Sequence, residues 1–153
     1  VNNAKLIVGD FRDEKCLKSE FDLITAFRFL PNAEHQLRNE AFSFFKENLK
    51  DNGLLIFNNH RSFWSFSYVF FRIFGLKLFK EGMTHKEVCN LTDKYGFKII
   101  NCYSLGVIPQ TEKKSILPFF LTKIIENLNL SLFSKLHLLG YNNIYVCTTK
   151  GTI

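Results

Sequence analysis

The sequence has no paired cysteines and no metal-ligand spacing. Its four cysteines, Cys16, Cys89, Cys102 and Cys147, form no C-x-x-C pair, and its four histidines lie apart from them. Metal sites need such ligands at short, regular spacing, so we expect no structural metal. The amino-terminal residues also lack the basic, apolar and small-residue order of a signal peptide. Together these absences predict a reducing, cytoplasmic setting.

The sequence also lacks a dense run of basic residues. Its net charge of +6 comes from 20 basic and 14 acidic residues that are spread along the 153-residue chain. An even spread is typical of a solvated surface, whereas nucleic-acid-binding proteins gather their basic residues in patches. We therefore do not favour nucleic acid as a partner.

No uncharged apolar run reaches the length of a membrane span. The longest candidate, residues 62–80, is crowded with aromatic residues, and phenylalanine accounts for 18 of the 153 residues. Arg72 and Lys77 interrupt it, so it falls short of the roughly 20 apolar residues that a span needs. We predict an aromatic-rich helical lid over a pocket, inserted at residues 61–82. The alternative is a helix that lies on a membrane surface.

Short apolar runs alternate with segments whose apolar residues recur every three or four positions. The runs predict strands, and the recurring spacing predicts amphipathic helices in a single α/β domain over residues 1–153. Thr84 and Glu87 have the form of a capping box, and Gly96 ends the helix that they begin. Because strands alternate with helices, we expect parallel pairing, with an antiparallel last strand at the end of the sheet. The predicted strands are residues 5–8, 21–27, 54–57, 97–103 and 143–149, and the predicted helices are residues 33–49, 84–95 and a segment after Pro118.

Ligands of an open parallel sheet bind beyond the carboxyl ends of its strands, where the loops diverge. Three segments occupy that position here, at residues 9–12, 26–29 and 58–61. We therefore expect the functional site to lie where these three segments meet.

The order of these segments resembles that of a known family. V-G-D-F-R-D is followed by F-D-L-I-T-A-F-R-F-L-P-N-A-E, then by L-K-D-N-G-L-L-I-F-N-N-H, and later by E-G-M-T and K-Y-G-F. From about Ala4 to Thr149, this succession resembles class I S-adenosylmethionine-dependent methyltransferases. The resemblance implies a partial Rossmann-like methyltransferase sheet, mostly parallel with a final antiparallel strand and with helices on both faces. It also implies S-adenosylmethionine as the cofactor.

The resemblance implies cofactor-binding roles for the first two segments. Asp10 matches the acid that accepts a hydrogen bond from the adenine amino group, and Phe11 matches the neighbour that borders the adenine ring. Ala26, Phe27 and Arg28 match the loop beside the methionine moiety, where a guanidinium can pair with a carboxylate. The alternatives are that Asp10 merely forms a turn and that Arg28 is simply exposed to solvent.

The third segment corresponds to the acceptor side of the family's site. Asn58, Asn59, Arg61 and Trp64 are the predicted substrate-binding residues. His60 is the candidate general base, because an unperturbed imidazole titrates close to neutral pH. The alternative for His60 is a capping or packing role.

The glycine-rich loop of this family is missing from the sequence. Family members begin with a strand, a G-x-G-x-G loop and an acid at the end of the next strand, whereas Gly9 is the only early glycine here. We therefore expect a fragment that lacks the first two strands and binds S-adenosylmethionine weakly or not at all by itself. Strands 5–8 and 21–27 then either pair directly or leave an apolar edge open to a partner chain, such as a second copy.

Two functions follow from these observations. The first is methyl transfer from S-adenosylmethionine to a small-molecule acceptor by the intact parent enzyme, with this chain alone inactive. The second is a non-catalytic remnant that acts as an interaction module through its aromatic-rich surface. A methyltransferase acting on nucleic acid is not favoured, because the asparagine-proline-proline-aromatic signature of base methylation is absent.

Overall fold

The computed structural model of the protein describes residues 8–12, 21–60, 65, 73, 82–106, 110–111, 114–115, 118–132 and 140–149. Residues 5–7 of the predicted strand 5–8 and nearly all of the predicted lid at residues 61–82 lie outside this part. The described elements are β1 (Phe21–Ala26), α1 (His35–Asn48), β2 (Leu49–His60), α3 (His85–Lys94), β3 (Phe97–Leu105), β4 (Gln110–Thr111), β5 (Lys114–Ser115), α4 (Phe119–Leu132) and β6 (Asn142–Thr149).

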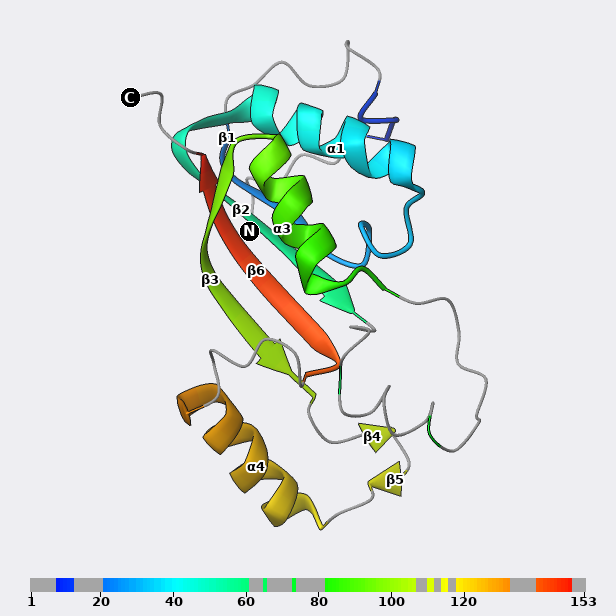
Figure 1. Ribbon diagram of the computed structural model, residues 1–153, viewed down its shortest axis with the longest axis vertical. Coiled ribbons are helices and arrows are strands. Elements are labelled where there is room, and N and C mark those ends of the chain that lie inside the picture. Colours follow the sequence, from blue (N-terminus) through cyan, green and yellow to red (C-terminus); the bar gives the residue numbers. More distant parts are fainter. Residues whose placement is uncertain are drawn as a thin grey trace.

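Four strands form one sheet in the order β1-β2-β6-β3, while β4 and β5 pair separately (Figure 1). β1 and β2 pair in parallel, as predicted, and β6 pairs antiparallel with both β2 and β3. The α/β class and the mostly parallel sheet with one antiparallel strand are therefore confirmed. The expectation that the last strand lies at the end of the sheet is wrong, because β6 lies between β2 and β3.

The burial pattern of β6 matches its central position. Buried and half-buried residues alternate along its whole length, as in a strand with neighbours on both edges. In β3, by contrast, Lys98, Ile100, Asn101 and Tyr103 are exposed. The inner strand β6 is thus the more buried of the two, and the edge strand β3 is the more exposed.

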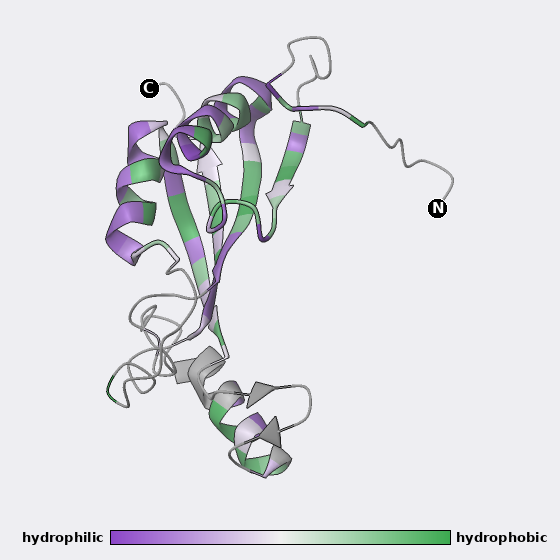
Figure 2. Ribbon diagram, turned by 90° about the vertical axis from the view of Figure 1, so that its right-hand side faces the viewer, coloured by the Kyte–Doolittle hydropathy of each residue, from purple (hydrophilic) through white to green (hydrophobic). Residues whose placement is uncertain are grey.

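An aromatic core joins the sheet to its helices, and α1 and α3 both lie on one face (Figure 2). Phe42 of α1 is fully buried and meets Phe57 and Phe97 edge to face, with ring centroids 5.7 and 5.9 Å apart. Phe57 also stacks on Tyr145 of β6 at 5.3 Å. Edge-to-face and offset stacked rings are the favourable aromatic arrangements, so this cluster holds α1 on the sheet.

The opposite face of the sheet carries exposed apolar side chains. Leu23 of β1 is 50% exposed and Tyr103 of β3 is 44% exposed, whereas Tyr145 and Cys147, which point towards the helices, are fully buried. Among the described residues, no strand pairs with the outer edge of β1. Within the described residues, α1 and α3 cover one face of the sheet, and neither lies on the second face, where the resemblance also implies helices.

The local signals at both ends of α3 take the forms that the sequence predicts, and two residues of β2 have special backbone requirements. Thr84 and Glu87 form the predicted capping box, and Gly96 ends α3 in the left-handed conformation with φ 73°. Asn52 at the start of β2 is also left-handed, with φ 63°. A β-carbon at Gly53 would lie 2.7 Å from Leu49 Cγ, so only glycine fits this close approach.

Within the part of the chain that the structure describes, no helix is both long and apolar enough to cross a bilayer. α4 lies beyond the carboxyl end of β3 (Figure 1) and exposes Phe120 and Ile124.

Candidate active site

The carboxyl ends of β1 and β2 and the segment at residues 8–12 lie side by side. The backbone N–H of Arg28, just after β1, donates to Asn58 Oδ1 of β2 at 2.6 Å. The ring of Phe11 meets that of Phe29 edge to face, with centroids 5.9 Å apart. The three segments that the sequence singles out as ligand-facing are thus direct neighbours.

Arg28 has an unusual backbone conformation at this junction. Its φ of 58° is left-handed, which costs a non-glycine residue about 1–2 kcal/mol. Asn58 holds it on one side, and Asn32 Nδ2 donates to the Arg28 carbonyl at 2.5 Å on the other. Asn58 Nδ2 in turn donates to Asn142 Oδ1 at 2.9 Å, so one amide ties β1, β2 and β6 together. Strained backbone held by its surroundings is typical of functional sites.

The remaining residues of this loop differ in exposure. Ala26 is buried, Phe27 is 52% exposed, and the Arg28 side chain points into solvent. An exposed guanidinium beside a half-exposed ring is free to meet a ligand.

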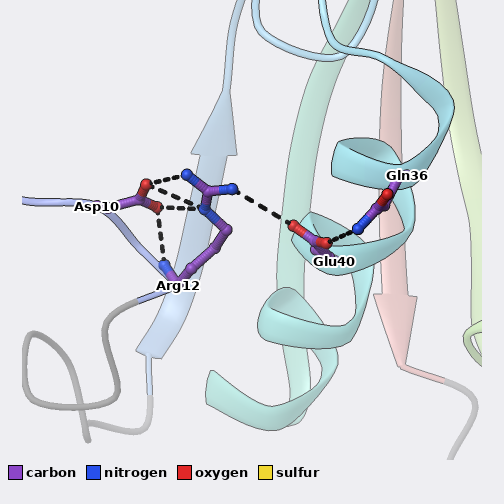
Figure 3. A network of polar contacts seen from close by, with 4 residues as sticks. All are labelled: Asp10, Arg12, Gln36 and Glu40. Carbon is purple, nitrogen blue, oxygen red and sulfur yellow. Dashed lines mark hydrogen bonds and ion pairs between the residues drawn. The ribbon is translucent and has the colours of Figure 1, made fainter.

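Asp10 is held by Arg12 (Figure 3). The backbone N–H of Arg12 donates to Asp10 Oδ1 at 3.0 Å. The Arg12 side chain donates from Nε to both carboxylate oxygens of Asp10 at 3.0 Å, and its Nη2 forms an ion pair with Asp10 Oδ2. These hydrogen bonds lower the pKa of Asp10 to about 2, so the carboxylate is ionised at neutral pH. Arg12 Nη1 also lies 4.0 Å from Glu40 Oε2, which links this segment to α1.

Side chains at the end of β2 alternate between the two faces of the sheet. Asn59 is fully buried on the helical side, where its Nδ2 donates to the Met83 carbonyl at 2.6 Å and its Oδ1 accepts from Met83 N–H at 3.1 Å. Asn58 and His60 point to the opposite side. Asn58 is 4% exposed and His60 is 9% exposed. His60 lies opposite Asn142 in the pairing of β2 with β6.

Solved structures share this arrangement of strands and helices, although no family model and no curated protein matches the sequence. A methyltransferase from Thermotoga maritima, dependent on S-adenosylmethionine, is 17% identical with a TM-score of 0.55, over 88% of this chain and 58% of that one. Another such enzyme, from Archaeoglobus fulgidus, is 11% identical with a TM-score of 0.50, over 86% and 60%. The pyocyanin biosynthetic protein PhzM is 13% identical with a TM-score of 0.54, over 92% and 33%. This chain has the class I methyltransferase fold.

The chain spans less than two thirds of the length of each of these structures, from 33% to 60%. In the methyltransferase fold of this chain, β1 is an edge strand of the described sheet.

The structure sorts the predicted site residues of this methyltransferase fold into three groups. Asp10, Phe11, Ala26, Phe27, Arg28, Asn58 and His60 lie at or beside the strand junction. Asn59 lies on the helical side, where both ends of its amide bind Met83. Arg61 and Trp64 lie outside the described residues.

Sequence reasoning missed two residues of the junction, Arg12 and Asn142. An arginine two residues after an aspartate is a usable local signal, because such a short separation lets the side chains meet. Asn142 carries no comparable signal, since it is 84 residues from Asn58 in the sequence. In the described part of the chain, no three histidine, cysteine, aspartate or glutamate side chains gather in a way that could hold a metal ion.

A separate polar chain lies between α3 and the sheet. His85 Nδ1 is 3.0 Å from Tyr145 Oη, and Cys89 Sγ is 3.4 Å from His85 Nε2. Burial raises the pKa of Cys102 and of Cys147 to about 12, and burial followed by the charge of Asp93 raises the pKa of Cys89. These thiols are therefore protonated at neutral pH and are weak nucleophiles.

Replacing Arg12 with glutamine should raise the pKa of Asp10 towards the ordinary value of an aspartate, because the Arg12 hydrogen bonds cause the lowering. The Asp10–Arg12 ion pair stabilises the fold when the pH is above the ordinary pKa of an aspartate, and this contribution is lost as the pH falls towards about 2. Carboxyl carbon NMR shifts followed against pH measure the pKa directly. Glu40→Gln is the control and should leave it nearly unchanged. An Asp10 midpoint that stays near 2 in Arg12→Gln would contradict the assignment.

Replacing Asn58 with alanine should lower the free energy of unfolding by about 1–3 kcal/mol, because the two part-buried hydrogen bonds of its amide are lost. Asn101→Ala is the matched control, since Asn101 is exposed in β3, and it should change stability by less than about 0.5 kcal/mol. Urea unfolding of both variants gives the comparison. Equal losses in the two variants would show that the Asn58 bridge contributes nothing specific.

Proposed function

We propose that this chain supplies the adenine and acceptor sides of an S-adenosylmethionine-dependent methyltransferase site, and that the intact protein transfers the methyl group to a small-molecule acceptor. The contact between the segment at residues 8–12 and the tips of β1 and β2 carries this proposal. Phe11 meets Phe29, and Arg28 binds Asn58, within the fold of a methyltransferase. Ligands of such sheets bind at this end of the strands.

Residues of the segment 8–12 and of the loop after β1 fit an adenosyl group. Asp10 is ionised and can accept a hydrogen bond from an exocyclic amine, although the amine must share the carboxylate with Arg12. Phe11 is half-buried and offers an apolar border. Arg28, together with the half-exposed Phe27, would face the methionine end, where a guanidinium pairs with a carboxylate.

The acceptor would bind on the side of Asn58 and His60. S-adenosylmethionine, when bound, supplies a methyl group on a positively charged sulfur, so alignment of the nucleophile is the main requirement. His60 would take the proton that the acceptor loses. Arg61 and Trp64 follow directly in the sequence and would line the acceptor pocket.

Asp10→Ala in the intact protein, translated from the start of its reading frame, should weaken S-adenosylmethionine binding at least about tenfold. A hydrogen bond to a charged acceptor contributes about 1.5–3 kcal/mol, and 1.4 kcal/mol is tenfold. Calorimetric titration measures the affinity, and mass spectrometry of candidate acceptors detects methylated product. Asp22→Ala is the matched control, because Asp22 is another exposed aspartate with one cationic partner, Lys50 at 2.9 Å.

Equal weakening by the Asp10 and Asp22 variants would contradict the role of Asp10. The 153-residue chain alone should bind the cofactor weakly or not at all, because its sequence has no glycine-rich loop. Micromolar binding by this chain alone would show that the missing loop is not needed.

A second candidate function is an interaction module that uses the open edge of β1. Leu23 is half exposed there, and Thr25 is exposed as well. Apolar edge strands with free backbone groups pair readily with another chain. We propose a second copy of this chain as that partner, with two β1 strands joining two sheets.

Leu23→Lys should convert a dimer into a monomer, because a charged side chain on an edge strand opposes pairing. Light scattering after size-exclusion chromatography measures the mass. Ile124→Lys is the control, since Ile124 is likewise 50% exposed but lies on α4. A wild-type chain that is monomeric at every concentration, or a dimer lost equally in both variants, would rule out this edge.

A further inference from the structure

A groove lies between α1 and α3, among residues that have no role in the proposed methyl transfer. Its volume is about 210 Å³. His35 and Arg38 line it from α1, and Glu87, Leu91 and Lys94 line it from α3. The two helices lie beside each other on the same face of the sheet (Figure 1).

Two permanent cations, Arg38 and Lys94, line the groove, and neither forms an ion pair with a described residue. Arg38 Nε donates to the Leu30 carbonyl at 2.8 Å, and its Nη2 reaches the Pro31 carbonyl at 3.4 Å, so its hydrogen-bond partners are neutral. Lys94 Nζ donates to Asn39 Oδ1 at 2.6 Å, which is also neutral. Within the described residues, the ion pairs closer than 4.0 Å involve neither Arg38 nor Lys94.

The acidic residue in the groove is already engaged. Glu87 Oε2 accepts from the backbone N–H of Thr84 at 2.6 Å and from its hydroxyl at 2.8 Å, as part of the capping box. Glu87 raises the pKa of Arg38 while burial, the larger effect, lowers it. Arg38 and Lys94 together outweigh the one carboxylate, so the groove carries a net positive charge.

The cationic groups are held in place before any ligand arrives. The Leu30 carbonyl fixes one edge of the Arg38 guanidinium and leaves other N–H groups of the fork available. Asn39 accepts from both Lys94 Nζ and Tyr95 Oη, the latter at 2.9 Å, and so positions the ammonium group. Fixed donors lose little freedom on binding, which favours affinity.

We propose that this groove is a second, non-catalytic binding site for an oxyanion, a phosphate or carboxylate group held by Arg38 and Lys94. A planar guanidinium matches the two oxygens of such a group, and the ammonium adds a point charge. Asn90 adds an exposed amide, while Met83 and Leu91 supply an apolar wall for the body that carries the anion. The volume suits one such group rather than a nucleotide.

Inorganic phosphate and sodium acetate, titrated separately at constant ionic strength into the 153-residue chain, test this site. Backbone amide NMR shifts should move saturably at α1 and α3, in the millimolar range, for at least one of the two anions. Saturation by phosphate alone identifies a phosphate-bearing ligand, and saturation by acetate alone identifies a carboxylate. The absence of saturable shifts with both anions would overturn the proposal.

Charge variants separate this site from general attraction of anions. Lys94→Gln should weaken binding about tenfold, and Arg38→Gln should weaken it by at least that much, because each removes a charge-assisted hydrogen bond. Lys46→Gln, on the last turn of α1 and outside the groove, removes the same charge and should change binding less than about twofold. Equal weakening by Lys94→Gln and Lys46→Gln would overturn the proposal. Because Lys94 is exposed, its variant gives a result even where Arg38→Gln impairs folding.

Discussion

Side chains of β2 alternate between the two faces of the sheet, and the rest of the structure depends on this register. Phe57 packs under Phe42 and stacks on Tyr145, while Asn59 anchors Met83 on the same side. A shift of one residue would exchange the two faces and expose these groups. The aromatic core therefore determines that Asn58 and His60 point away from the helices, towards the proposed acceptor.

Signals that act over a few residues were predictable from the sequence. The capping box joins Thr84 and Glu87 within one turn, and the strand ends at residues 26–29 and 58–61 follow from apolar runs that stop at polar residues. Parallel pairing of β1 and β2 follows from the intervening helix. These local patterns were enough to place the candidate site at the strand tips, because sheet geometry brings such tips together.

Contacts between distant residues were not predictable in the same way. The central position of β6 is set by its pairing with β2 and β3, which lie far from it in the sequence and leave no local signal. Asn58 and Asn59 look alike in the sequence, yet one bridges three strands and the other binds Met83. Arg28 adopts a left-handed backbone for which an arginine gives no sequence signal.

The uncovered face relates the two proposed functions to one another. Leu23 and Tyr103 leave about half of their surfaces in water on that face, where buried apolar area would contribute roughly 25 cal/mol per Å². The solved methyltransferases that share the fold are longer, since this chain spans 58% and 60% of two of them. The two proposals therefore differ in what covers this apolar surface, which is the rest of the intact enzyme in the first and a second copy of this chain in the second.

The central place of β6 also has a consequence for the order of folding. β2 pairs with a strand about ninety residues further along the chain, for example Asn58 with Ile144. While the polypeptide emerges from the ribosome, β1, α1 and β2 can assemble early, but the inner edges of β2 and β3 stay unpaired until residues 142–149 are synthesised. Such long-range closure is slow and leaves strand edges exposed to aggregation, so this domain should depend on chaperones during synthesis more than a fold with local pairing does.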